Sequence, residues 1–174
     1  VLAGALVPIL ATASVPEGIG VEEFLETTRS FLPSPLDGKQ AELTKGGDAA
    51  EYKADPTGVL AAFIFKTTAD PFVGKLSVFR VYQGTIKSNS EIWNSNREQS
   101  ERIGQLYLPK GKNQENVNEI MAGDIGAIGK LSASLTGDTM CVRDNAVKFP
   151  QIKQPVGYFR MAVTPASKDD LDKM

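Results

Sequence analysis

The feature that most constrains the fold is the stretch from residue 60 to residue 84, LAAFIFKTTADPFVGKLSVFRVYQG. Residues 60–68 are rich in aromatic and β-branched side chains, which favour a pleated strand over a helix. Pro71 interrupts this run because proline has no N–H to donate to a ladder, and Gly74 accepts a positive φ at little cost. A second β-type run follows at residues 76–82. The stretch therefore predicts two strands joined by a turn.

The alternation of side chains in these strands indicates what each face contacts. Both faces of the first strand are mostly apolar, so we expect its middle to be covered on both sides. In the second strand, Arg80 and Tyr82 lie on one face with Leu76 and Val78. A long arginine and a tyrosine at the end of an apolar face indicate that this face opens toward solvent or a partner.

Turn signals recur at short intervals after residue 58, with short β-type runs between them. They are Asp70-Pro71, Gln83-Gly84, Ser88-Asn89, Ser95-Asn96, Pro109-Lys110-Gly111, Gly123-Asp124 and Gly137-Asp138. This spacing predicts a mainly β fold, an antiparallel β-barrel over residues 59–150. Closing a sheet into a barrel removes most exposed strand edges.

The segments before the barrel are expected to be an α/β remnant and a linker. Residues 1–35 predict a short buried strand from Val7 to Ala11 and a helix that opens at Gly20. Residues 36–58 are rich in Pro, Gly, Asp and Lys without an apolar period. They predict an inter-domain linker, most mobile at residues 45–48.

The segment after the barrel, residues 151–174, begins a new structure. Apolar side chains alternate along residues 158–163, which predicts a strand, and Ser167 is expected to cap the first turn of a helix. A single strand of this kind is expected to be exposed, disordered or paired with another molecule. The chain is otherwise expected to be a monomer.

Composition excludes several classes of protein. The 174 residues carry a net charge of −2, so no global basic field attracts nucleic acid. An 18-residue apolar run and a signal-peptide pattern are both missing, which predicts a cytoplasmic protein without a membrane partner. The sequence has no histidine, so histidine-based triads and metal sites are excluded. Its single cysteine, Cys141, is expected to be a small core residue.

Nucleotide-binding motifs are not found in this chain. The string nearest to a P-loop, Gly74-Lys75-Leu76-Ser77, lacks the upstream glycine and the Ser or Thr after lysine, and we interpret it as a hairpin turn. Asp55-Pro56-Thr57-Gly58 matches a loose Asp-x-x-Gly pattern and is interpreted as a linker turn. The acidic pairs Glu22/Glu23 and Asp169/Asp170 fit first turns of helices. We predict neither a catalytic residue nor a metal site.

An ordered set of motifs resembles elongation factor G and its relatives. The similar segments are VPILATAS (7–14), GVEEFLETTRSFLPSP (20–35), ADPFVGKLSVFRVYQGTIKSNSEIWN (69–94), ERIGQLY (101–107), NEIMAGDIGAI (118–128), LTGDTMC (135–141) and PVGYFRMAVTPASKDDLDKM (155–174). The resemblance implies the end of a GTPase domain, the barrel of domain II and the start of domain III. It also implies a parent protein that hydrolyses GTP with Mg²⁺ to move tRNA and mRNA on the ribosome.

The resemblance further implies that the barrel docks on small-subunit ribosomal RNA and couples the GTPase domain to the other domains. The RNA-contact candidates are Lys75, Arg80, Tyr82, Lys87, Arg97 and Arg102, with Lys110 and Lys112 as further basic positions. Tyr82 and Trp93 are able to stack on bases, but packing on the outer face of the barrel is the preferred interpretation. Ala13 and Ser14 occupy a vestigial guanine-loop position.

Two alternatives remain open at this point. One is a free-standing β-barrel adapter that binds protein or RNA, which predicts a start codon at Val1. The other is the barrel of a ribosome-protection or release-type GTPase, since these relatives share this domain.

Overall fold

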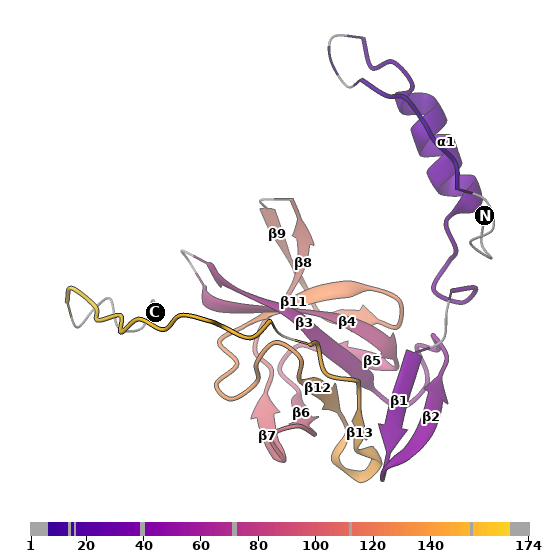
Figure 1. Cartoon of the computed structure of the whole chain (residues 1–174). Coiled ribbons are helices and arrows are strands. Elements are labelled where there is room, and N and C mark those ends of the chain that lie inside the picture. Colours follow the sequence, from indigo (N-terminus) through magenta and orange to yellow (C-terminus); the bar gives the residue numbers. More distant parts are fainter. Residues whose placement is uncertain are drawn as a thin grey trace. The chain divides into compact units, whose positions relative to one another are not determined.

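The computed structural model describes residues 7–13, 15, 17–38, 41–70, 73–111, 113–153 and 155–167 (Figure 1). The chain divides into two units, residues 1–39 and residues 40–174. Within the described ranges, the first unit contains the helix α1 and the second contains the β-sheets. The expectation of a mainly β, antiparallel fold is confirmed.

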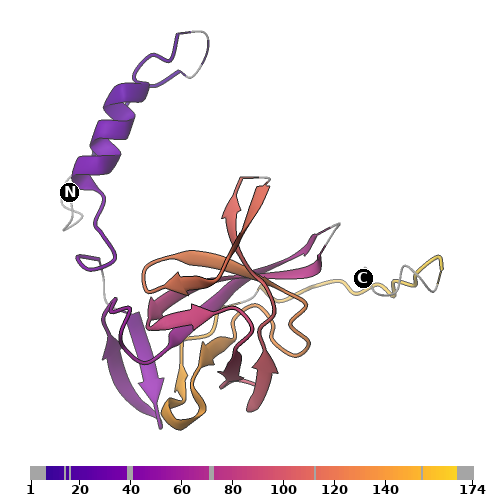
Figure 2. The same ribbon diagram turned by 180° about the vertical axis from the view of Figure 1, so that it is seen from behind.

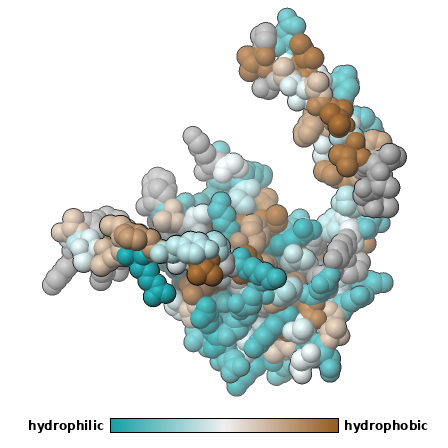
Figure 3. Space-filling model, in the orientation of Figure 1, coloured by the Kyte–Doolittle hydropathy of each residue, from teal (hydrophilic) through white to brown (hydrophobic). Residues whose placement is uncertain are grey.

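The first unit contains the helix α1 (Val21–Phe31), as the sequence predicts. Gly20 precedes it with a φ of 71°, and Glu22 and Glu23 lie in its first turn, where acids are favourable. No residue of α1 is buried, and Figure 3 shows apolar side chains at the surface of this segment. Among the described residues, no helix is long and apolar enough to cross a membrane.

The buried strand expected at Val7–Ala11 is wrong. Residues 7–12 form no strand, and Val7 and Ile9 are 80% and 93% exposed. A strand requires a partner for its backbone groups, and the described residues of this unit form a single bridge, between Ala13 and Ile19. An apolar sequence alone therefore does not form a strand here.

The second unit is built on an eight-stranded sheet in which every neighbouring pair is antiparallel (Figures 1 and 2). Its strands, in spatial order, are β7 (Gln99–Arg102), β6 (Glu91–Asn94), β12 (Thr139–Cys141), β3 (Ala61–Asp70), β4 (Gly74–Gln83), β11 (Ile125–Gly129), β8 (Leu106–Lys110) and β9 (Asn113–Val117). The central pair β3–β4 is the predicted pair of strands, and Gly74 has the predicted positive φ, 80°.

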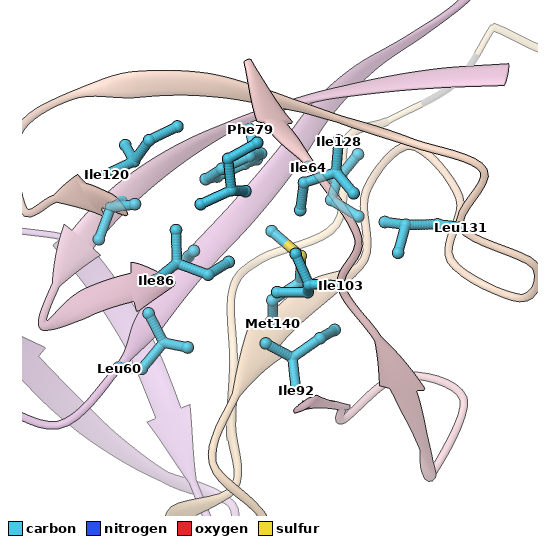
Figure 4. Packing of buried hydrophobic residues seen from close by; sticks show 13 residues of the cluster. Leu60, Ile64, Phe79, Ile86, Ile92, Ile103, Ile120, Ile128, Leu131 and Met140 are labelled. Carbon is cyan, nitrogen blue, oxygen red and sulfur yellow. The ribbon is translucent and has the colours of Figure 1, made fainter. Parts of the chain in front are cut away.

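A two-stranded sheet completes the barrel. It pairs β5 (Thr85–Lys87) with β10 (Glu119–Met121), and Ile86 faces Ile120 across it. Both isoleucines point into the main core, which collects side chains from most strands (Figure 4). The core members are Leu60, Ala62, Ile64, Phe79, Val81, Ile86, Ile92, Ile103, Leu106, Ile120, Ile128, Leu131 and Met140.

The expectation that β3 is covered on both faces holds for its first half. Ala62 and Ile64 lie in the main core, whereas Ala61 and Phe63 contact a second cluster on the other face. The pairing with β4 then shifts register between Ile64 and Lys66. Phe65 lies at this bulge and is 37% exposed.

Residues 41–52, which composition predicts to be linker, form a hairpin instead. It consists of β1 (Ala41–Lys45) and β2 (Asp48–Tyr52), and β1 also pairs with β13 (Val147–Lys148) after the short 3₁₀ turn η1 (Arg143–Asn145). Gly46 and Gly47 have φ values of 61° and 102°, as a type I′ turn requires. Leu43 is the one strongly apolar residue of β1, and it is buried in the second cluster. One buried leucine is too little to create a periodic signal.

The strand predicted at residues 158–163 is also wrong. This segment has no strand, and Tyr158 and Phe159 are 100% and 79% exposed. Its alternating sequence is strand-like, but none of the described strands pairs with it. Ser167 is described, whereas the helix expected after it lies outside the described residues.

Gly84 tests the turn between β4 and β5. Its φ is 76°, and an added Cβ would lie 2.7 Å from Leu60 Cα and 2.8 Å from Gly58 O. Because backbone atoms cannot give way easily, we expect Gly84→Ala to lower the free energy of unfolding by about 3 kcal/mol in urea denaturation. Gly111 is the control: its φ is 62°, and nothing lies within 4 Å of its added Cβ. Gly111→Ala should cost about 1 kcal/mol, and equal costs for both variants would contradict the clash.

Candidate nucleic-acid interface

Two of the predicted basic contacts are used inside the protein. The Lys75 ammonium donates a hydrogen bond to the Ser134 carbonyl at 2.7 Å. Arg97 Nε donates to Asp138 Oδ2 at 3.0 Å, and the Asp138 carboxylate is nearly buried. Both basic side chains therefore hold the loop between Leu131 and Asp138, and the charge of Arg97 is paired with the Asp138 carboxylate.

The same loop is anchored by the buried carboxylate of Glu101, which is 5% exposed. The carboxylate accepts hydrogen bonds from Ala133 N at 2.7 Å, Ser134 N at 3.0 Å and Ser132 Oγ at 3.0 Å, and also from Ser134 Oγ. Burial acts to raise the pKa of Glu101, but these donors favour the ionised form more strongly and hold the pKa below its usual range. Glu101 is therefore a charged anchor.

An amide network continues from this anchor to the β6–β7 turn. Asn94 is buried and donates through Nδ2 to Ser134 Oγ at 2.7 Å and to Asp138 Oδ2 at 3.0 Å. Its Oδ1 accepts from the backbone of Asn96 and Arg97, both at 3.0 Å. The position of Arg97 is therefore fixed from its backbone as well as from its guanidinium.

Tyr82 packs against the protein, as the preferred interpretation predicts. Its ring centroid lies 4.6 Å from that of Phe149 at an interplanar angle of 45°. Arg80 Cζ lies 5.5 Å from the centroid of the same ring. Tyr82 thus belongs to a second apolar cluster, and the face that it shares with Arg80 is covered at this end instead of open. The buried members of this cluster are Leu43, Ala61, Cys141, Val147 and Phe149.

Trp93 and Cys141 occupy the same cluster. Trp93 packs against it, with Arg143 Cζ 5.0 Å from the centre of its ring system. Cys141 is fully buried, and burial raises the pKa of its thiol. The expectation that Cys141 is a core residue is confirmed.

Lys87 and Arg102 are the predicted basic contacts that stay available. Both are exposed, and neither side chain makes a hydrogen bond or ion pair with another described residue, although the Lys87 carbonyl accepts a hydrogen bond from Ser90 Oγ at 2.6 Å. Lys87 ends β5 and Arg102 ends β7, so each lies at a strand end. Lys110, by contrast, is paired with Glu115 across the β8–β9 hairpin. Lys112 lies outside the described residues.

Arg102 borders a hollow of about 370 Å³ that the sequence does not reveal. The hollow is lined by Val73, Arg102, Gly104, Gln105, Tyr107, Gly129 and Lys130. We call it the Arg102 groove. Lys130 is a basic residue that sequence reasoning missed. In the sequence, Lys130 is marked only by its place directly after Gly129, which ends β11, and this pattern is too common to identify a site.

The two strings that partly match nucleotide-binding motifs, residues 74–77 and 55–58, both form turns or strand starts in the second unit. Gly74 to Ser77 begins β4 at the end of a hairpin and does not precede a helix, so a P-loop geometry is not formed. Asp55 Oδ1 accepts from Thr57 N at 2.8 Å and from Thr57 Oγ1 at 2.7 Å, which is the predicted turn. These donors lower the pKa of the Asp55 carboxyl.

The remaining predictions concern the guanine-loop position at Ala13 and Ser14 and the absence of a metal site. Ala13 forms an isolated bridge with Ile19, and Ser14 lies outside the described residues. In the described part of the chain, no group of three acidic, cysteine or histidine side chains is arranged to hold a metal.

Comparison with known families identifies one domain. A family model described as elongation factor G domain 2 matches residues 59–143. The match begins just before β3 and ends in η1, so it covers both sheets of the barrel and every residue that lines the Arg102 groove.

Glu101→Gln tests the charged anchor. Glutamine keeps the shape but loses the charge and one acceptor, so we expect the free energy of unfolding to fall by about 2 kcal/mol at about pH 7. The folded-state pKa lies below the usual 4.5, so the wild-type advantage is complete above that value. It is lost as the pH falls through the folded pKa. The two proteins should therefore converge in urea unfolding as the pH is lowered progressively below 4.5.

The control for this test is Glu119→Gln on β10, whose carboxylate is exposed. It should change the free energy of unfolding by less than about 0.5 kcal/mol. A Glu101→Gln penalty that stays constant between about pH 7 and about pH 3 would contradict a charged anchor.

Proposed function

Residues 59–143 are the second domain of an elongation factor G-like translation factor, and on this premise we propose that the protein acts in translocation on the ribosome. In this proposal, GTP hydrolysis elsewhere in the protein drives movement of tRNA and mRNA. The barrel docks on small-subunit ribosomal RNA and couples the neighbouring domains. This role places the protein in the cytoplasm.

The observation that carries the docking proposal is that Lys87 and Arg102 lie at strand ends with exposed side chains that form no ion pair with a described residue. Folded RNA is recognised largely through its shape and phosphates. A barrel with paired strands presents such charges on a rigid frame, so few backbone motions must be frozen on binding. Because the net charge is −2, attraction to phosphate is local to such positions.

The three-stranded sheet supports the coupling proposal. It joins β1 and β2, which precede the barrel, to β13, which follows it, in the order β13-β1-β2. Thr44 and Lys45 face Lys148 and Val147 across this sheet. The segments that enter and leave the barrel are therefore fastened to each other. A displacement of one is transmitted to the other through backbone hydrogen bonds.

The proposal assigns GTP and Mg²⁺ to another part of the protein, because the sequence of this chain lacks GxxxxGK[ST] and Asn-Lys-x-Asp motifs. We expect isothermal titration of the purified chain with GTP and Mg²⁺ to give no heat of binding. A control titration with ATP should give the same result. GTP binding with micromolar affinity would contradict this assignment.

Lys87→Ala tests docking. We expect the chain to bind isolated small subunits weakly, since only a few phosphates are contacted, and the variant to weaken this binding several-fold. The slope of log K against log salt should become shallower by about 0.9 for the lost contact. Lys53→Ala is the matched control, because Lys53 is an exposed lysine next to β2 and outside the proposed contacts. Equal losses for both variants, or tight binding that persists at high salt, would argue against specific docking.

The gene itself separates this proposal from its alternatives. A P-loop encoded upstream of Val1 supports a GTPase, whereas an in-frame start codon at Val1 favours a free-standing adapter. A ribosome-protection or release-type protein is distinguished by assay, because it would not restore translocation to ribosomes that lack their own factor.

A further inference from the structure

We propose that the Arg102 groove binds one unpaired nucleotide of single-stranded RNA, with its base on Tyr107 and its phosphates at Arg102 and Lys130. This inference rests on the proposed ribosomal function and specifies a contact within it. The groove lies wholly in the barrel unit, between the β3–β4 turn, the start of β8 and the end of β11.

The charge of the groove selects an anion. Arg102 and Lys130 are exposed, and neither forms an ion pair with a described residue. The third nearby cation, Lys75, does not line the groove, and its ammonium donates a hydrogen bond to the Ser134 carbonyl at 2.7 Å. Glu91 faces Arg102 across the β6–β7 ladder, but the structure forms no bridge between them. Two free cations on one hollow attract phosphate more than isolated surface lysines do.

Tyr107 supplies an aromatic surface. Its side chain is half-buried on β8, on the same side as its cross-strand partner Ala127. Its hydroxyl makes no hydrogen bond with a described residue. Beside the ring lies Gly129, where an added Cβ would approach Tyr107 Cε2 to 3.9 Å and Val73 Cγ1 to 2.3 Å. Gly129 has no side chain, and the Val73 Cγ1 methyl takes up the space where its Cβ would lie. The ring of Tyr107 lines the hollow and is the flat surface on which a base stacks.

The walls of the groove are fixed before any ligand binds. The Gln105 amide donates to the carbonyls of Leu106 at 2.9 Å and Val117 at 3.1 Å. Lys130 has a φ of 63°, unusual for a residue with a Cβ, and its N–H donates to the Lys75 carbonyl at 2.9 Å. Strained positions of this kind concentrate at ligand sites. A preformed groove loses little conformational entropy on binding.

The accessibility and the chemistry of the groove favour a single-stranded nucleotide over other anions. The hollow is open to solvent, so an unpaired base can reach it, whereas bases inside a duplex are stacked and paired and cannot enter. An acidic peptide would use the two cations but would gain nothing specific from the face of Tyr107. The combination of ring and cations is the arrangement that single-stranded nucleic acid uses.

The test is fluorescence anisotropy of labelled hexauridylate with the whole chain at low salt. We expect Arg102→Ala combined with Lys130→Ala to weaken binding at least ten-fold and to remove most of the salt dependence. Tyr107→Leu should weaken it on the order of ten-fold without changing the charge, whereas Tyr107→Phe should bind like the wild type. In NMR spectra, the backbone amide chemical shifts of Gly104 and Gly129 should change when hexauridylate is added. Thermal unfolding of each variant verifies that it is folded.

The matched control is Lys53→Ala combined with Lys148→Ala, which removes two exposed lysines outside the groove. It should change binding by less than about two-fold. The inference is overturned if hexauridylate fails to bind, or if this control weakens binding as much as the groove variant. It is also overturned if Tyr107→Leu has no effect, or if a duplex or a glutamate-rich peptide competes as well as the single strand. If the wild-type chain does not bind hexauridylate but Lys87→Ala still weakens binding to small subunits, the groove proposal is refuted and the docking proposal remains supported.

Discussion

Backbone pairing of β3 with β4 runs from Ala61 opposite Gln83 to Asp70 opposite Gly74, and the rest of the barrel is added to its two sides. On one side β12 and then β6 and β7 continue the sheet, and on the other side β11, β8 and β9 do so. Because the pair is central, its inner face carries Ile64 and Phe79 into the core, and its outer face supports the second cluster. A fault in its register would turn both sets of side chains to the wrong side.

Buried charge organises the part of the barrel that the core does not reach. The Glu101 and Asp138 carboxylates hold the loop between Leu131 and Asp138 through backbone amides and hydroxyls. Lys75 and Arg97 are drawn into the same network. The predicted basic contacts thus differ in role: Lys75 and Arg97 stabilise the loop, whereas Lys87 and Arg102 lie at strand ends without a side-chain partner among the described residues. Removing one partner of a buried charged group lowers the free energy of unfolding more than removing an exposed ion pair does.

Local patterns predicted those elements that are stabilised locally. The β3–β4 turn, the helix after Gly20 and the burial of Cys141 follow from glycine, proline and apolar spacing, and the structure confirms them. The β1–β2 hairpin was missed because its strands are polar and its one strongly apolar residue, Leu43, is buried in the second cluster. The strand expected at residues 158–163 failed for the converse reason. Its pattern is strand-like, but it has no ladder partner among the described strands.

The sequence by itself determined the family of the barrel, its antiparallel strands and the positions of its turns, because these depend on residue type and short spacing. Tertiary structure alone decided which cations are free, since Lys75 and Arg97 meet partners 59 and 41 residues away in the chain. It also decided that Arg102, Tyr107 and Lys130 border one hollow. Long-range hydrogen bonds and the pairing of strands that lie far apart in the chain bring these side chains together, and neither is encoded in a local pattern.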